Sequence, residues 1–266
     1  MKSILITGAG TGLGRGTAIG LAQAGHQVIA TARNEPQISD LRADIAKLGL
    51  SKSIVVEKLD LLNEDDIEAV AGWHFDTFVS NAGLGQGGPI AEVPMALVRD
   101  IFETNVFANL ALTQRVVRKF VHGGIKGRLI FLSSMGGLMT VYGLGAYGAT
   151  KHAIEAIASC LRDELADYGI SVQTINPGPY KTGFNDRMAQ SAVNLPDTPN
   201  KVSDETIVRE RLAFLTANQF DPQEMIGRMV EIIGADDGLY RNVWPPQIEK
   251  LVKDFQAESW TKNASP

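Results

Sequence analysis

Cysteine is nearly absent from this sequence: one residue among 266, Cys160. A single cysteine excludes a disulfide within the chain and favours a reducing, cytoplasmic compartment. Because Cys160 stands among apolar residues of a helical segment, we expect it to be a buried helix residue rather than a nucleophile. The four histidines are scattered without metal-ligand spacing, so no metal site is predicted.

Long apolar segments and an excess of positive charge are also lacking. No stretch of about 18 uninterrupted apolar residues occurs, so the sequence predicts no membrane span. The first residues, MKSILITGAG, pass from a short apolar run directly into glycines and do not resemble a signal peptide. The net charge of −5 argues against nucleic acid or an anionic membrane as the main partner.

Apolar residues make up 44% of the chain, enough for a sizeable core, and they fall into alternating strand-like and helix-like segments. The strand-like runs are SILIT (Ser3–Thr7), HQVIATA, SIVVEKLD, FDTFVS, RLIFLSS and ISVQTIN. Helical patterns follow the first run up to Ala24 and then cover residues 38–48, 65–71, 95–122 and 146–168. This alternation predicts an α/β fold with a doubly wound, Rossmann-like parallel sheet.

The pattern loosens after Pro177, where we expect a substrate lid over residues 179–221 with a helix near 204–215. A further helix is predicted at 222–233, turn-rich chain at 236–246, and a C-terminal helix and tail over 247–266. No repeat, linker or low-complexity tract divides the chain, so residues 1–266 are predicted to form one domain.

TGAGTGLG (Thr7–Gly14) lies between the first predicted strand and the first predicted helix, where a dinucleotide-binding loop belongs. Gly8 allows the tight turn, Gly12 the close approach of backbone to pyrophosphate, and Gly14 the packing of helix on sheet. The free N–H groups and positive dipole end of the following helix favour phosphate.

The end of the second predicted strand, ATARN, indicates which cofactor binds there. NAD-binding folds place an acid at this point for the ribose 2′-hydroxyl, but Ala32 and Arg33 stand here. Arginine offers charge-assisted hydrogen bonds to a 2′-phosphate, which favours NADP, with NAD remaining open.

AYGATKHAIEAIA carries Tyr147 and Lys151 at positions i and i+4, on one face of a predicted helix. Two common surface residues can meet at this spacing by chance. Alternatively, the ammonium lowers the pKa of the phenol so that it moves a proton at neutral pH. The pair alone does not decide between these interpretations.

Together with these motifs, others occur in an order that resembles the short-chain dehydrogenase/reductase family over nearly the whole chain. TGAGTGLG is similar to the family's TGxxxGxG, and SNAG (Ser80–Gly83) to its NNAG, with Ser80 in place of the first Asn. The further matches are Asp60 in KLDLL, Asn105 in ETNVF, Ser134 thirteen positions before Tyr147, and NPGPYKT (Asn176–Thr182). The C-terminal part resembles hydroxysteroid- and retinol-dehydrogenase members.

The resemblance implies an enzyme with Ser134, Tyr147, Lys151 and Asn105 as the catalytic group. Tyr147 would exchange the proton with substrate, its pKa lowered by Lys151, and Ser134 would hold the substrate oxygen. Lys151 would also bind the nicotinamide ribose, and Asn105 would anchor a water that links Lys151 to solvent. Of the neighbours Ser133 and Ser134, only one is expected to face the site.

The cofactor site implied by the resemblance includes residues from each of these motifs. We expect it to comprise Gly8, Thr11, Gly12, Leu13, Gly14, Arg33, Asp60, Leu61, Asn81, Ala82, Gly83, Tyr147, Lys151, Pro177, Gly178, Tyr180 and Thr182.

The substrate is expected to be a small, uncharged, lipophilic alcohol, ketone or aldehyde, because apolar residues follow Ser134 and occupy the lid. These are Met135, Leu138, Met139, Val141, Tyr142, Leu144, Tyr180, Phe184 and Met188, with Gly85, Gly87 and Gly88 leaving space opposite. Equally, these side chains can simply pack the lid on the core. A homodimer or homotetramer is compatible with the sequence. Two other functions stay open: a dinucleotide-sensing regulator, and cofactor-independent lyase or dehalogenase-type chemistry.

Overall fold

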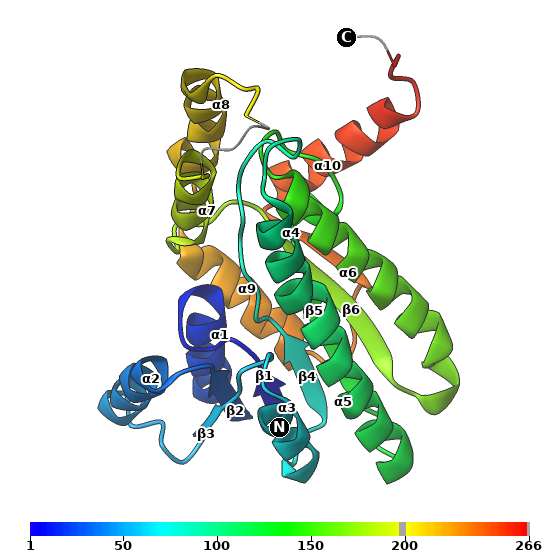
Figure 1. The fold of residues 1–266 in the computed structure, drawn as a ribbon. Helices are drawn as coiled ribbons and strands as arrows, with labels where there is room; N and C mark the ends of the chain where they lie inside the picture. The colour runs from blue at the N-terminus through cyan, green and yellow to red at the C-terminus, as the bar shows by residue number, and fades with distance from the viewer. Residues whose placement is uncertain (197–200, 265–266) are drawn as a thin grey trace.

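Seven parallel strands form the centre of the molecule, in the order β3-β2-β1-β4-β5-β6-β7 (Figure 1). The computed structural model describes residues 1–196 and 201–264. Its strands are β1 (Ser3–Ile6), β2 (Gln27–Ala32), β3 (Ile54–Lys58), β4 (Thr77–Ser80), β5 (Arg128–Leu132), β6 (Ser171–Pro177) and β7 (Arg241–Trp244). The strand order reverses direction between β1 and β4, which confirms the predicted doubly wound sheet.

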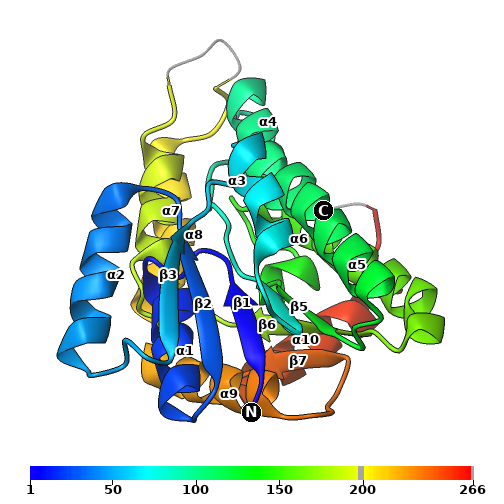
Figure 2. The ribbon, with the colours of Figure 1, turned by 90° about the horizontal axis from the view of Figure 1, so that it is seen from below.

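Helices cover both faces of this sheet (Figure 2). One face carries α1 (Gly12–Gln23), α2 (Glu35–Lys47) and α9 (Pro222–Gly234); the other carries α3 (Glu64–Ala69), α5 (Asn109–Gly123) and α6 (Gly145–Glu164). The remaining α-helices are α4 (Met95–Phe102), α7 (Phe184–Val193), α8 (Glu205–Ala217) and α10 (Pro246–Ser259). The predicted lid and tail include residues 197–200 and 265–266, which lie outside the described part of the chain.

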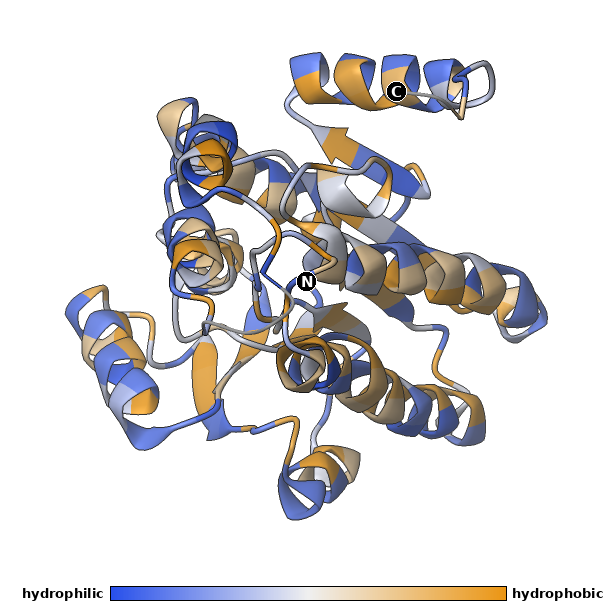
Figure 3. Ribbon diagram, turned by 45° about the horizontal axis from the view of Figure 1, so that its top comes forward, coloured by the Kyte–Doolittle hydropathy of each residue, from blue (hydrophilic) through white to orange (hydrophobic). Residues whose placement is uncertain are grey.

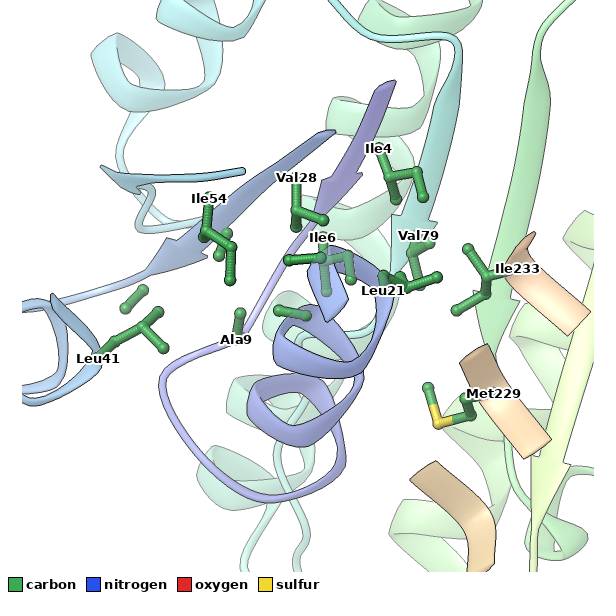
Figure 4. Packing of buried hydrophobic residues seen from close by; sticks show 14 of the residues in the cluster. Ile4, Ile6, Ala9, Leu21, Val28, Leu41, Ile54, Val79, Met229 and Ile233 are labelled. Atoms are coloured by element: carbon green, nitrogen blue, oxygen red, sulfur yellow. The ribbon is translucent and has the colours of Figure 1, made fainter. Parts of the chain in front are cut away.

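Alternation along β1 divides the core into two halves. Ile4 and Ile6 pack with α1, α2 and α9, where Leu21 and Met229 join them (Figure 4). Leu5, between them in the sequence, points to the opposite face and packs with α5 and α6. Successive strand residues point to opposite faces, so a strand that is buried on both faces reads as an unbroken apolar run.

The seventh strand corrects the sequence prediction. Residues 236–246 were expected to be turn-rich, yet Arg241–Trp244 forms β7 and pairs in parallel with β6, Asn176 lying opposite Val243. The strand has only four residues and starts with a charged and an amide side chain, so it lacks the apolar run that marks the inner strands. Its place at the edge of the sheet allows this composition.

The helix predicted over residues 95–122 is interrupted. Glu103–Ala108 forms a π-helical turn between α4 and α5, which shifts the hydrogen-bond register by one residue. The amide of Asn109 donates to the carbonyls of Thr104 (2.9 Å) and Asn105 (3.4 Å). The Asn109 side chain thus reaches carbonyls in the first half of the π turn, including that of the predicted site residue Asn105.

The lid contains a helix that the sequence pattern did not predict. α7 packs directly on the loop after β4: Gly87 N donates to the Ser191 hydroxyl (2.9 Å), and a Cβ on Gly87 would collide with the carbonyl of Met188. A Cβ on Gly85 would lie 3.0 Å from the Phe184 ring. The glycines expected to leave open space therefore allow close packing of the lid.

Figure 3 shows that the helices have distinct apolar and polar sides, as expected for helices that cover a sheet. Across residues 1–196 and 201–264, none of the helices combines the length and the hydropathy needed to cross a membrane.

Candidate active site

The predicted site residues gather where the strands end. The glycine loop follows β1, Asn81–Gly83 follows β4, Ser134 follows β5, and the segment up to Thr182 follows β6. The carboxyl ends of parallel strands meet at one edge of the sheet, and the ligands of open α/β sheets bind at that edge near the reversal of strand order. Tyr147 and Lys151 reach the same edge from α6.

The glycine loop is held tightly against the loop after β4. Gly8 has a φ of +66°, and a Cβ on it would lie 2.8 Å from the Cα of Ala82. A Cβ on Gly14 would collide with the side-chain amide of Asn81, which donates to the carbonyls of Thr7 (2.7 Å) and Gly8 (3.1 Å). These contacts fix the course of the loop independently of any ligand.

The start of α1 fits an anionic group. Thr11 is the N-cap, but its side chain makes no capping hydrogen bond, and the first turn carries no acidic residue. Gly12, with a φ of +57°, is exposed and faces Thr182, whose Cβ lies 3.6 Å from a Cβ placed on Gly12. Uncapped N–H groups, a glycine surface and an opposing hydroxyl are what a pyrophosphate requires.

Arg33 is exposed directly after β2, and within the described residues it has no hydrogen-bond or ion-pair partner. The next residue, Asn34, caps α2 by accepting from Gln37 N at 3.1 Å. Asp60 Oδ1 accepts from Leu62 N at 3.1 Å, so this carboxylate holds its own turn after β3, and Leu61 is buried. The guanidinium of Arg33 is thus available to a ligand at the end of β2.

Ser134 and Tyr147 come together over Gly136. The Ser134 hydroxyl accepts from Gly136 N (3.0 Å), and a Cβ on Gly136 would lie 3.5 Å from this hydroxyl and 3.6 Å from Cε1 of Tyr147, a residue that is 7% exposed. The Ser133 hydroxyl is buried against Gly137 without a hydrogen-bond partner among the described residues. Of the two serines, Ser134 is therefore the one that lies beside Tyr147.

Lys151 completes this group from the next turn of α6. Its ammonium lies 5.8 Å from the centroid of the Tyr147 ring and donates to the carbonyl of Leu132 (2.8 Å). The side chain is buried, and among the described residues the charged group that favours its protonated form is Glu155, one helical turn further on. Ser134, Tyr147 and Lys151 are thus brought into one cluster.

The pKa values within this cluster differ from the sequence expectation. Burial raises the pKa of Tyr147 to about 12, although the hydrogen bond from Ser134 opposes the shift. Burial also lowers the pKa of Lys151 to about 8. In the protein by itself, loss of solvation therefore outweighs the nearby ammonium, and a lowered phenol pKa stays a prediction for the protein with oxidised nicotinamide bound.

Asn105 is fully buried in the π turn, and its side chain is bound on both sides. Its Oδ1 accepts from Leu84 N (2.7 Å), and its Nδ2 donates to the carbonyl of Leu84 (2.9 Å) and the hydroxyl of Thr150 (3.1 Å). A Cβ on Gly83 would lie 3.2 Å from Asn105 Oδ1 and 3.8 Å from Lys151 Nζ, so the two residues share one neighbourhood. The Asn105 amide thus connects the loop after β4, at Leu84, to α6, at Thr150.

The predicted apolar wall divides into two groups. Met135, Leu138 and Met139 pack against α10 in a separate cluster with Ile248 and Val252. Leu144, Phe184 and Met188 surround Tyr147, with the Phe184 ring centroid 5.8 Å from that of Tyr147.

Tyr180, predicted for both the pocket and the cofactor site, packs instead in the core cluster that contains α1 and α9. Its ring centroid lies 5.7 Å from that of Phe220, and the side chain is 2% exposed. Its hydroxyl has no hydrogen-bond partner among the described residues. Burial raises the pKa of this phenol.

Two charged residues behind the site were not predicted. Glu155 is buried, and its carboxylate accepts from Asn176 Nδ2 (2.6 Å) and from Arg241 Nη2 (3.1 Å). The position of Glu155 four residues after Lys151 was the available signal, since i and i+4 share a helix face. Arg241 had no such signal, because its segment was interpreted as turns.

Cys160 also departs from expectation, because it is exposed. On α6 the residues that enter the core are Ile154 and Ala158, and Cys160 stands on a different side of the helix. It lines a surface groove between α5 and α6. Among residues 1–196 and 201–264, no three potential ligand side chains are grouped closely enough to hold a metal ion.

Comparison with known proteins agrees with this fold. The family model described as short chain dehydrogenase matches residues 2–192. The uncharacterized oxidoreductase YusZ of Bacillus subtilis (strain 168) is 37% identical over 203 residues, 73% of this chain and 71% of that protein. The diacetyl reductase [(S)-acetoin forming] of Staphylococcus epidermidis (strain ATCC 12228) is 31% identical over 203 residues, 74% of this chain and 78% of that protein.

Solved structures repeat the fold. A short-chain dehydrogenase from Streptomyces avermitilis superposes with a TM-score of 0.78 at 25% identity, over 98% of this chain and 93% of that one. A putative NAD(P) dependent gluconate 5-dehydrogenase from Beutenbergia cavernae, with bound NADP, has a TM-score of 0.74 at 25% identity, over 91% and 94%. The chain belongs to the short-chain dehydrogenase/reductase family and is an oxidoreductase that acts on CH–OH and C=O groups.

Proposed function

We propose that this oxidoreductase uses NADP to interconvert a hydroxyl and a carbonyl group on a small, uncharged, lipophilic substrate, with Tyr147 as the acid/base. The observation that carries the proposal is the convergence of Ser134, Tyr147 and Lys151 beside an uncapped, glycine-lined helix start. A regulator that only senses a dinucleotide has no need of that cluster. Chemistry without a nicotinamide has no need of the glycine loop.

The residues present fit a dinucleotide phosphate. The amides of Gly12–Gly14 and the hydroxyl of Thr182 would hold the pyrophosphate, and Arg33 would pair with a 2′-phosphate. When bound, the cofactor supplies or receives the hydride. The solved relative from Beutenbergia cavernae contains NADP, which supports the same choice here.

The protein supplies the proton and the position. Tyr147 would donate its proton to the carbonyl oxygen in reduction and accept one from the hydroxyl in oxidation. Ser134, which lies beside the phenol, would hold the same oxygen. Tyr147 is protonated at neutral pH, and burial raises its pKa further, so the chain by itself holds the acid form that carbonyl reduction requires.

An uncharged substrate is supported by the apolar lid. Phe184 and Met188 pack with Tyr147, whereas the nearby cations Lys181 and Arg187 are exposed. The name of the Staphylococcus relative, a diacetyl reductase, describes a small uncharged dicarbonyl compound as substrate.

Self-association into a homodimer is proposed through the groove between α5 and α6, which has a volume of about 710 Å³. Apolar residues line its floor, and Arg118 and Glu164 lie within the same surface. In a twofold interface, the same patch faces itself, so these opposite charges would pair across the two copies. A cytoplasmic location agrees with the single, unpaired cysteine.

Titration with NADPH and NADH, followed by nicotinamide fluorescence, tests the cofactor assignment. We expect NADPH to bind more tightly than NADH to the wild type, and the difference to disappear in Arg33→Ala. Arg99→Ala, which removes an exposed arginine from α4, is the matched control and should leave the preference unchanged. Equal binding of both cofactors by the wild type would contradict the NADP assignment. Failure of both to bind would contradict hydride transfer altogether.

A further inference from the structure

Glu155 carries a buried carboxylate one helical turn behind Lys151, at 7% exposure. A carboxylate that leaves water loses several kcal/mol of solvation, so it persists in its charged form only with good partners. Here Arg241 provides a cation at 3.1 Å from Oε2, and Asn176 donates to Oε1 at 2.6 Å. The partners come from β7 and β6, so the carboxylate joins α6 to the last two strands of the sheet.

Asn176 passes this connection on to the active site. Its Nδ2 donates both to Glu155 Oε1 and to the backbone carbonyl of Ser134 (3.2 Å). Its Oδ1 accepts from the hydroxyl of Thr174 (3.1 Å), which fixes the orientation of the amide. A continuous path of hydrogen bonds therefore leads from Arg241 through Glu155 and Asn176 to Ser134.

α6 holds the segment that carries Ser134 from two sides. Lys151 Nζ donates to the carbonyl of Leu132 (2.8 Å), and Glu155, through Asn176, fixes the carbonyl of Ser134. Ser133 N, between them, donates to the carbonyl of Ile175 in β6 (2.8 Å). Leu132 at the end of β5 and the two serines that follow it thus each have one backbone group held by a hydrogen bond, which fixes the position of the Ser134 backbone beside Tyr147.

The charge of Glu155 also acts on the cluster. Among the described residues, the titratable groups that interact electrostatically with the Glu155 carboxylate are Lys151 on the same helix and Arg241 and Tyr240 at β7. Of these, Arg241 donates a hydrogen bond to the Glu155 carboxylate, and the Lys151 side chain is buried. A negative charge one turn away favours the ammonium form of a buried lysine.

We propose that Glu155 is a positioning residue of the active site, which fixes the Ser134 backbone through Asn176 and holds Lys151 in its charged form. The inference rests on the proposed function, in which Ser134 and Lys151 act on substrate and cofactor. Through Arg241, strand β7 would then help to position Ser134 and Lys151, which precede it by about a hundred residues.

The charge effect is measured without turnover, by NMR titration of protein labelled with [13Cε]lysine. The Lys151 signal, assigned by its loss in Lys151→Arg, should titrate near pH 8 in the wild type. In Glu155→Gln it should titrate at lower pH, and in Glu258→Gln, the same change at an exposed site on α10, it should not move. An unshifted Lys151 titration in folded Glu155→Gln would overturn the proposal.

The positioning effect is measured by kinetics with NADPH and a carbonyl substrate. Glu155→Asp keeps the charge but withdraws the carboxylate from Asn176, so kcat should fall by roughly tenfold to a hundredfold while the KM for NADPH stays close to that of the wild type. The decline of kcat at alkaline pH should occur at the same pH in Glu155→Asp as in the wild type, whereas in Glu155→Gln it should occur at lower pH. An unchanged kcat in Glu155→Asp would overturn the positioning role.

The two kinds of failure can be told apart. A wild type that binds no cofactor or reduces no carbonyl contradicts the proposed function, while the Lys151 titration still decides the role of the Glu155 charge. Circular dichroism melts of each variant identify any that does not fold. Glu155→Asp keeps a carboxylate for Arg241, so we expect it to be more stable than Glu155→Gln.

Discussion

Burial acts in opposite directions on the two central residues of the site. It disfavours the charged form of each group, so Tyr147 keeps its proton up to about pH 12 and Lys151 loses its proton near pH 8. A spacing of four residues in a helix predicts that the two side chains meet, but it contains no information on solvation. The direction in which each of the two pKa values changes is therefore set by burial in the fold and could not be predicted from the spacing.

Carbonyl reduction should depend on pH through Lys151. Because its pKa is lowered to about 8, the ammonium is present below that pH and is lost as pH rises through it, while Tyr147 remains protonated throughout. We expect kcat/KM for reduction with NADPH to be level between about pH 6 and 7 and to decline above about pH 8. A rate that keeps rising through pH 9 would show that the charge of Lys151 is not required.

Replacing the phenol isolates the proton transfer. Tyr147→Phe keeps the ring that packs on Phe184 and removes the hydroxyl proposed to exchange the proton, so kcat should fall by about 10²- to 10⁴-fold. NADPH affinity, measured by fluorescence, should change little. Phe184→Leu, which alters the same contact without removing an acid, should retain far more activity; equal losses in the two variants would contradict the acid/base role.

At the residue scale, the sequence predicted the residues whose spacing is local. Ser134, Tyr147 and Lys151 follow from fixed intervals within one strand-turn-helix unit, and the structure brings them together. Tyr180 did not follow the prediction, because its ring turns into the core beside Phe220. Glu155 and Arg241 could not be paired from the sequence, since only the order of strands in the sheet makes them neighbours.

At the scale of elements, the lid is anchored by one buried carboxylate. Glu92, in the loop after β4, accepts from the backbone N–H groups of Val202 (3.0 Å) and Ser203 (2.6 Å) and from the Ser203 hydroxyl (2.8 Å). These contacts lie directly before α8. Hydrogen bonds to the charged form lower the pKa of Glu92.

Weakening this anchor should loosen α8. In Glu92→Gln the amide can no longer accept all three hydrogen bonds, so hydrogen exchange of Glu205–Ala217 should be faster. In the wild type, the contribution is complete above the ordinary glutamate pKa of about 4.3 and is lost as pH falls through the lowered value. Glu210→Gln, an exposed change on α8 itself, is the control; identical exchange in both variants would contradict an anchoring role.

The elements that the sequence predicted well are those with strong periodicity. Six strands and the helices α1, α5, α6 and α9 follow from apolar patterns, because both faces of the sheet are buried. β7 was missed because an edge strand of four residues needs no apolar run, and the π turn because it preserves the amphipathic pattern on either side. α7 was missed because it is short and contains only a few apolar residues.

At the scale of the whole molecule, the groove between α5 and α6 is the surface proposed for self-association. Ile157 lies in its floor. Ile157→Arg would place like charges against each other in a twofold contact, so we expect light scattering to report a smaller species than for the wild type. Ile207→Arg, at an exposed apolar site on α8, should leave the mass unchanged. A wild type that is monomeric at all concentrations would contradict the proposed dimer.

The partner of Glu155 comes 86 residues later in the chain, at the start of β7. The glycine loop, Ser134, Tyr147 and Lys151 are therefore synthesised well before Arg241. A nascent chain that has not yet reached β7 contains the residues proposed to touch substrate, but its Glu155 carboxylate lacks a cation. The contacts that reach Ser134 from Arg241 through Glu155 are consequently complete only when β7 has paired with β6.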